Sequence, residues 1–196
     1  MKVQIMNRRN FIFSITVLLT TSLPAFALYD PKPDPIFAAI QGEWKGTLAY
    51  RDYNQPAKVA SPTTPPTAGT PNEMVMLTTT LFVALAGPKA LTLHYVFDDG
   101  PGKTVYSYER MNFDFEKNEL AWASGAADKP ATTYRITANL MEENNRKILF
   151  ERAEGGGVNR YTLLINASAF KLEKYEVDVT GVALLRNRYQ FVRPNR

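Results

Sequence analysis

The chain has one histidine, His94, so this residue limits the metal and acid–base chemistry that the sequence can support. A single imidazole cannot build the multi-histidine sites that hold zinc or non-haem iron. His94 alternates with Thr92 and Val96, opposite a face that carries Leu93 and Tyr95, as a histidine on a β-strand would. We therefore interpret it as a structural or surface residue and expect no metal site.

Nucleophilic catalysis finds little support in the other residue types. The sequence contains no cysteine, which excludes a thiolate nucleophile, a thiolate metal site and a disulfide framework. None of the four serines after residue 27 lies in the G-x-S-x-G pattern of a nucleophile elbow. Paired carboxylates for glycoside hydrolysis stay open, because their separation is set in three dimensions. We expect a protein that is not an enzyme and that needs no cofactor.

Cationic and aromatic side chains are the better candidates for binding a small molecule. Arg186 and Arg188 share one face of a strand near the C-terminus, whereas Asn187 and Tyr189 lie on the other. If the arginines face inward, they could hold an anionic group by bidentate hydrogen bonds; otherwise they are solvated or lie at one end of the fold. The candidate ligand-binding residues are Trp44, Tyr50, Tyr95, Tyr134, Arg186, Arg188 and Tyr189.

The elements that must position these side chains are mostly β-strands. The strand at 42–53 alternates Trp44, Leu48 and Tyr50 with polar residues, which is typical of a half-buried strand. Short apolar or alternating runs then recur between turns rich in glycine, proline, aspartate and asparagine. We predict these further strands at 74–85, 91–97, 104–111, 112–115, 120–124, 132–140, 147–152, 159–165, 170–179 and 182–192.

Ten or eleven strands joined by short turns predict an all-β fold. The spacing favours a single antiparallel up-and-down β-barrel of about ten strands, because closure removes the exposed edges of a long meander. A β-sandwich is the main competitor. A short N-terminal helix is predicted over 35–40, because Asp34 can cap it, Pro35 suits its first position and Gly42 follows its end.

The N-terminus has the pattern of a secretory signal peptide. Lys2, Arg8 and Arg9 precede an apolar run at 11–23, and residues 25–27 provide the small-x-small site of a signal peptidase. The run is short for a membrane span, so we expect cleavage after residue 27 and no integral span afterwards. Export by the Sec route and export by the twin-arginine route both fit, and the bacterial style of the signal predicts a periplasmic or secreted protein.

Removing this segment changes the electrostatic argument. The formal charge of the whole chain is +4, but residues 1–27 hold three basic residues and no acidic ones, which leaves a nearly neutral remainder. We therefore expect no nucleic-acid partner. The predicted organisation is a signal peptide at 1–27, a lead-in with the short helix at 28–41, and a barrel domain at 42–196.

A long segment at 54–72 carries five prolines and several threonines. Proline cannot donate to a central ladder, so this segment is predicted to be a loop. Loops of this length in compact domains are often functional. It therefore offers an alternative role for the protein, as an envelope interaction scaffold that makes contact through this loop.

The sequence Gly42-Glu43-Trp44, on the first strand and just after a short helix, resembles the opening of the lipocalins and the wider calycin barrels. The resemblance implies that Trp44 closes one barrel end and packs against a late basic residue, for which Arg186, Arg188 and Arg193 are candidates. The chain departs from lipocalins in its lack of cysteines and of a C-terminal helix. In these respects it looks more like fatty-acid-binding proteins or nitrobindin-type haem barrels, and the latter would imply His94 as an axial haem ligand.

These observations favour a non-catalytic barrel that binds a small hydrophobic or amphipathic molecule. A barrel of about ten strands is wider than one of eight, and so leaves more room for a ligand. The sequence thus looks like a bacterial secreted member of the lipocalin-like barrels.

Overall fold

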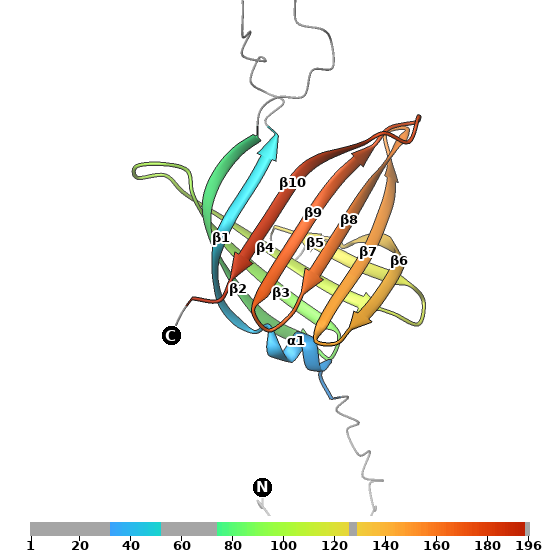
Figure 1. Cartoon of the computed structure of the whole chain (residues 1–196), viewed down its shortest axis with the longest axis horizontal. Coiled ribbons are helices and arrows are strands. Elements are labelled where there is room, and N and C mark those ends of the chain that lie inside the picture. The colour runs from blue at the N-terminus through green and yellow to red at the C-terminus, as the bar shows by residue number, and fades with distance from the viewer. Residues whose placement is uncertain (1–31, 52–73, 126–128, 195–196) are drawn as a thin grey trace, which may run out of the picture. The chain divides into compact units, whose positions relative to one another are not determined.

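The computed structural model describes residues 32–51, 74–125 and 129–194, and these form a closed antiparallel β-barrel (Figure 1). Each strand pairs with its neighbours in chain order, and β1 pairs with β10 to close the barrel. The elements are α1 (Pro35–Ala39), β1 (Gly42–Arg51), β2 (Met74–Gly87), β3 (Ala90–Asp98), β4 (Thr104–Asp114), β5 (Glu119–Ser124), β6 (Thr132–Glu142), β7 (Asn145–Glu154), β8 (Gly157–Ile165), β9 (Ala169–Val177) and β10 (Ala183–Val192). The predicted barrel is confirmed, and closure excludes the sandwich.

The one strand that sequence reasoning divided is β4. Residues 104–111 and 112–115 were predicted as two strands, but they form one strand that ends at Asp114. Met111 and Phe113 are both buried on its inner face, so the alternation passes through Asn112 without a break. The number of strands described is therefore ten.

The barrel closes through a close approach of two backbones. Gly46 on β1 lies opposite Phe191 on β10. A Cβ atom at Gly46 would lie 1.9 Å from the backbone oxygen of Gln190, a distance that no side chain permits. The absence of a side chain at Gly46 is thus a condition for the β1–β10 ladder.

Helix α1 lies across one end of the barrel (Figure 1). The Asp34 carboxylate accepts hydrogen bonds from the backbone N–H groups of Ile36 and Phe37, as expected for the predicted N-cap. Phe37 and Ile40 are fully buried, and the Phe37 ring lies 5.1 Å from that of Phe113. We call this the closed end. The predicted helix is confirmed: it begins at Pro35 as predicted and ends at Ala39, one residue before the predicted end.

Two sequence predictions lie outside the described residues: the signal peptide at 1–27 and the proline-rich loop at 54–72. Among the residues that the structure does describe, no helix is long and apolar enough to cross a membrane. The same residues contain no cluster of three or more His, Asp or Glu side chains that could hold a metal ion.

Candidate functional site

Trp44 belongs to the structure of the closed end. Its side chain is fully buried, and the indole N–H donates to the backbone oxygen of Ile40 at 2.9 Å. The Arg193 guanidinium lies 4.3 Å from the Trp44 ring and donates to the backbone oxygens of Ala39 and Gln41. Of the three arginines considered from the sequence, Arg193 is therefore the one that packs on Trp44.

The opposite end of the barrel contains a cavity of about 470 Å³, which we call the mouth cavity. This volume falls within the range of small-molecule sites. The apolar part of its lining comes from inward-facing residues on four strands. The polar part is mainly cationic. The lining residues are Leu48, Tyr50, Arg51, Leu77, Phe97, Asp99, Val105, Lys174, Arg186 and Asn187.

Three cations and one carboxylate contribute to this lining. Lys174 and Arg186 both lie near Glu176, at 3.9 Å and 3.6 Å between charged atoms. The Arg51 Nε donates to the backbone oxygen of Leu185 at 2.9 Å. Three cations against Asp99 and Glu176 leave one net positive charge at the opening, above the apolar part of the lining. Such an arrangement attracts the anionic end of an amphipathic molecule.

A β-bulge explains how Arg186 reaches this cavity. The pairing of β10 with β9 shifts register between Leu185 and Asn187, and Arg186 is the extra residue at this shift. Arg186 and Asn187 therefore both line the mouth cavity, although neighbours on a regular strand would face opposite sides. Sequence periodicity alone carried no sign of this irregularity.

Below the mouth cavity, aromatic rings line the barrel interior in two groups. Tyr95 contacts Tyr189, with ring centroids 5.1 Å apart, and stacks on Phe97 at 5.8 Å. The second group contains four rings in mutual contact, with centroids 4.9 to 5.8 Å apart. Its members are Trp122, Tyr134, Phe150 and Tyr161.

Glu109 is the acidic residue of this interior. It is 8% exposed, and burial raises the pKa of its carboxyl from 4.5 to about 7. The nearby indole N–H of Trp122 offsets part of this rise, although its geometry falls short of a hydrogen bond. Burial also raises the pKa values of Tyr95, Tyr161 and Tyr189, so these phenols stay neutral at ordinary pH.

The structure brings together four of the seven ligand-site residues predicted from the sequence. Tyr50 and Arg186 line the mouth cavity, and Tyr95 and Tyr189 contact each other beneath it. Tyr134 lies in the second aromatic group. Their role in ligand binding stays a prediction.

Two predicted site residues lie elsewhere. Trp44 is part of the closed end, and Arg188 lies on the outer face of β10, where its Nε donates to Glu173 at 2.7 Å. Arg188 alternates with the inward-facing Tyr189, so the arginine cannot share the interior with the tyrosine.

Sequence reasoning missed Lys174 and Glu109, although both carried a signal. Lys174 follows the buried Phe170 and Leu172 at intervals of two. Glu109 precedes the buried Met111 in the same way. A charged residue in phase with a buried apolar face predicts a charge inside the barrel.

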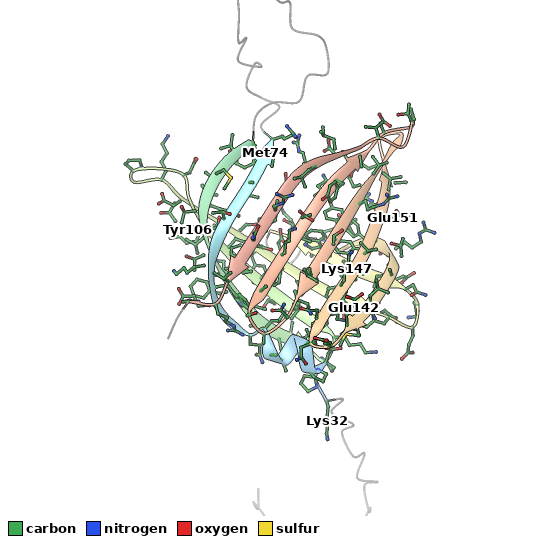
Figure 2. The ribbon with its side chains drawn as sticks, in the orientation of Figure 1. Lys32, Met74, Tyr106, Glu142, Lys147 and Glu151 are labelled. Atoms are coloured by element: carbon green, nitrogen blue, oxygen red, sulfur yellow. The ribbon has the colours of Figure 1, made fainter. Side chains whose placement is uncertain are left out.

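His94 lies on the outer face of the barrel. Its side chain is exposed, and its ring contacts those of Phe82, Tyr106 and Tyr108 at centroid distances of 6.2 to 6.5 Å. Tyr106 is itself 66% exposed (Figure 2). The surface position predicted for His94 is confirmed. Because it is the one histidine in the sequence, no imidazole faces the barrel interior.

A second hollow, of about 1140 Å³, is an open groove along β6 and β7. Most of its lining residues face outward, including Glu151, which pairs with both Arg135 and Arg160 (Figure 2). The hydrogen bond from Arg135 is the main cause that lowers the pKa of the Glu151 carboxyl. Charges of both signs are thus paired within the groove.

Fold and site together define a single-chain antiparallel barrel with a ligand-sized cavity at the end opposite its helix. No family model and no curated protein sequence matches the chain. Among solved structures it is similar to Rv2717c from M. tuberculosis, with 10% sequence identity, a TM-score of 0.52, and coverage of 84% of this chain and 100% of that one. An S-type phycobiliprotein lyase, CPES from Guillardia theta, shows 6% identity over 82% of this chain and 91% of its own, with a TM-score of 0.48.

The similarity to Rv2717c bears on the fold alone. It agrees with the closed antiparallel barrel expected from the sequence, which the strand pairing confirms. Membership of the wider calycins, like membership of the lipocalins themselves, stays a prediction.

Proposed function

We propose that the protein binds a small amphipathic, anionic molecule in the mouth cavity and that it does so without catalysis. The observation that carries this proposal is the composition of the cavity: Leu48, Leu77 and Phe97 form apolar walls beneath Lys174 and Arg186. A carboxylate, sulfate or phosphate group of the ligand would meet the cations, and an apolar tail would cover the walls.

The size of the cavity limits the ligand. A hollow of about 470 Å³ suits a molecule of modest size rather than a polymer or a folded partner. The apolar lining supplies affinity through burial of the tail, and the cations set the orientation of the ligand and steer its approach.

Octanoate and octanol form the matched pair of probes for this proposal, because they share a tail and differ in charge. Isothermal calorimetry is expected to show octanoate binding more tightly than octanol. Lys174→Met is expected to weaken octanoate binding about tenfold, since it removes a charge-assisted contact, and to leave octanol unchanged.

Lys147→Met provides the control. Lys147 is exposed on β7 and does not line the mouth cavity (Figure 2). Its substitution should leave the binding of both probes unchanged. Equal affinity of the unaltered protein for octanoate and octanol, or equal loss of octanoate binding in the two variants, would contradict the proposal.

We also propose that the barrel acts outside the cytoplasm, after removal of residues 1–27. The support is the basic start, the apolar run and the small residues at 25 and 27. Cell fractionation and N-terminal sequencing of the expressed protein test this proposal. A mature chain that begins at Leu28 is expected in the periplasm or medium, and a cytoplasmic chain that keeps its N-terminus would contradict it.

A further inference from the structure

Three buried polar atoms in the barrel interior have no hydrogen-bond partner among the described residues. They are the Tyr95 hydroxyl, the Glu109 Oε2 and the Trp122 Nε1. Buried polar atoms are nearly always satisfied by protein groups, by water or by a ligand, because an unmade hydrogen bond in the interior is costly. Three such atoms together therefore indicate a place where another molecule contributes the missing partners.

The register of the sheet places these groups on one diagonal of the inner wall. Glu109 on β4 pairs with Leu93, two residues from Tyr95 on β3. On its other side, Met111 of β4 pairs with Trp122 of β5, again two residues along from Glu109. Diagonal neighbours of this kind lie close enough for long side chains to meet around one point.

No cation pairs with this carboxylate among the described residues: Lys174 also faces inward, but it lies near Glu176, 3.9 Å between charged atoms, and 6.0 Å from the centre of the Tyr161 ring. Glu109 takes part in none of the ten ion pairs found among the described residues, which lie on the outer face of the barrel or at its ends. A buried carboxylate is stable in its charged form only when a positive group reaches it.

Aromatic rings stand on both sides of Glu109. Tyr95 and Tyr189 form one side, and Trp122 and Tyr161 belong to the other group. No ring contact joins these two groups among the described residues. Aromatic faces attract organic cations, and the attraction grows where water is excluded.

We propose that Glu109, Tyr95 and Trp122 form an interior subsite for the ammonium group of a small organic amine. The ammonium donates to Glu109 Oε2 and to the Tyr95 hydroxyl oxygen, and the Trp122 N–H donates to the same carboxylate. The rings of Trp122 and the neighbouring tyrosines contact the rest of the cation. This subsite uses residues that do not line the mouth cavity, so its test is independent of the test of the anion site proposed above.

Protonation of Glu109 gives the subsite a pH dependence. With a pKa of about 7, the free carboxyl is largely neutral in mild acid and charged in mild base, and an ammonium ion binds the charged form. The groups facing it are Tyr95 from β3, Tyr161 from β8 and Tyr189 from β10, all with raised pKa values, and Trp122, which does not titrate. Glu109 is therefore the group that changes charge in this range.

Octylammonium, compared with octanol and octanoate, tests the subsite in the intact protein. Calorimetry is expected to show octylammonium binding more tightly than octanol at about pH 8, with affinity falling about tenfold toward about pH 6. Binding near neutral pH should release protons, detected by repeating the titration in buffers of different ionisation enthalpy. Fluorescence of Trp122 should change on octylammonium binding.

Glu109→Gln keeps the shape of the side chain and removes its charge, so it should lower octylammonium affinity at about pH 8 by at least about tenfold. Octanoate binding should persist in this variant, which separates the two sites. Glu142→Gln, an exposed change on β6, is the matched control and should behave as the unaltered protein (Figure 2).

Octylammonium binding that is no tighter than octanol binding, or that survives in Glu109→Gln, would overturn the proposal. If the glutamine variant fails to fold, proton release by the unaltered protein decides the question. Release of protons supports the subsite, and its absence contradicts it.

Discussion

The closed end and the open half of this barrel differ in whether their buried polar groups have hydrogen-bond partners. At the closed end, the Trp44 indole, the Asp34 carboxylate and the Arg146 guanidinium all have protein partners, and Arg146 pairs with Asp34 itself. In the open half, three buried polar atoms lack partners and a cavity remains above them. The difference teaches that the closed end satisfies its polar groups within the fold, whereas the open half, where we propose ligand binding, leaves three of them without a protein partner.

From this comparison we expect substitutions in the two regions to affect different properties. Changes at the closed end should alter the free energy of unfolding and leave binding alone. Changes in the open half should alter binding, and some should even stabilise the fold, because they remove polar groups that the folded chain does not satisfy.

The largest loss of stability is expected for Gly46→Ala at the β1–β10 ladder. Its methyl group would meet the backbone oxygen of Gln190 at 1.9 Å, so the two strands must separate. We expect a loss of at least about 3 kcal/mol in chemical denaturation. Gly87→Ala is the control, since its methyl group would meet Ala90 at an ordinary 3.5 Å and should change stability by under about 1 kcal/mol. Similar stability of the two variants would refute this account of the closure.

The next largest change in stability is expected for Glu109→Gln, and it should be a gain and not a loss. The pKa of Glu109 is raised from 4.5 to about 7, so the folded chain loses stability as the pH rises through this window. Glu109→Gln removes the loss and should stabilise the protein by roughly 3 kcal/mol at about pH 8, but by only about 1 kcal/mol at about pH 5.

Urea denaturation at the two pH values measures the stability of this variant. A Glu142→Gln control should show little change at either pH, because Glu142 is exposed. Destabilisation by Glu109→Gln at about pH 8 would show that the carboxylate is satisfied in the folded protein and would remove the contrast between the two halves.

A smaller loss is expected from Arg193→Met at the closed end. The substitution removes the cation over the Trp44 ring and the hydrogen bonds to Ala39 and Gln41, with a cost of about 1–2 kcal/mol. Arg110→Met on the exposed outer face of β4 should cost under about 0.5 kcal/mol. Thermal unfolding of both variants, followed by circular dichroism, makes the comparison. Equal melting temperatures would mean that Arg193 does not support Trp44.

The architecture was readable from the sequence because it depends on local signals. The barrel was predicted from the alternation along each strand and from the turn residues between strands. Helix α1 was predicted from its Asp34-Pro35 start. The division of β4 between Met111 and Asn112 failed because the sequence alone does not show whether a strand ends there or continues. An asparagine is compatible with an outward-facing position in one continuous strand and with a break between two strands. Only the pairing of β4 with β5 distinguishes these alternatives.

The candidate site was less readable because it depends on register and irregularity. Tyr50, Tyr95 and Tyr189 follow from alternation, since each shares a face with buried neighbours. Arg186 enters the mouth cavity through a bulge that no local pattern predicts. The meeting of Glu109 with Trp122 depends on how β4 and β5 are paired, which is a property of two strands and not of either one.

The central claim, that the open half holds a small amphipathic ligand, is tested most directly by native mass spectrometry. Leu77→Trp fills the mouth cavity with an indole and should change stability by under about 1 kcal/mol, because the added ring occupies existing space. Protein purified gently from the cells that make it should carry a small acidic molecule, and the Leu77→Trp variant should lack it. A bare chain in both samples, or the same bound acidic molecule in both, would contradict the account.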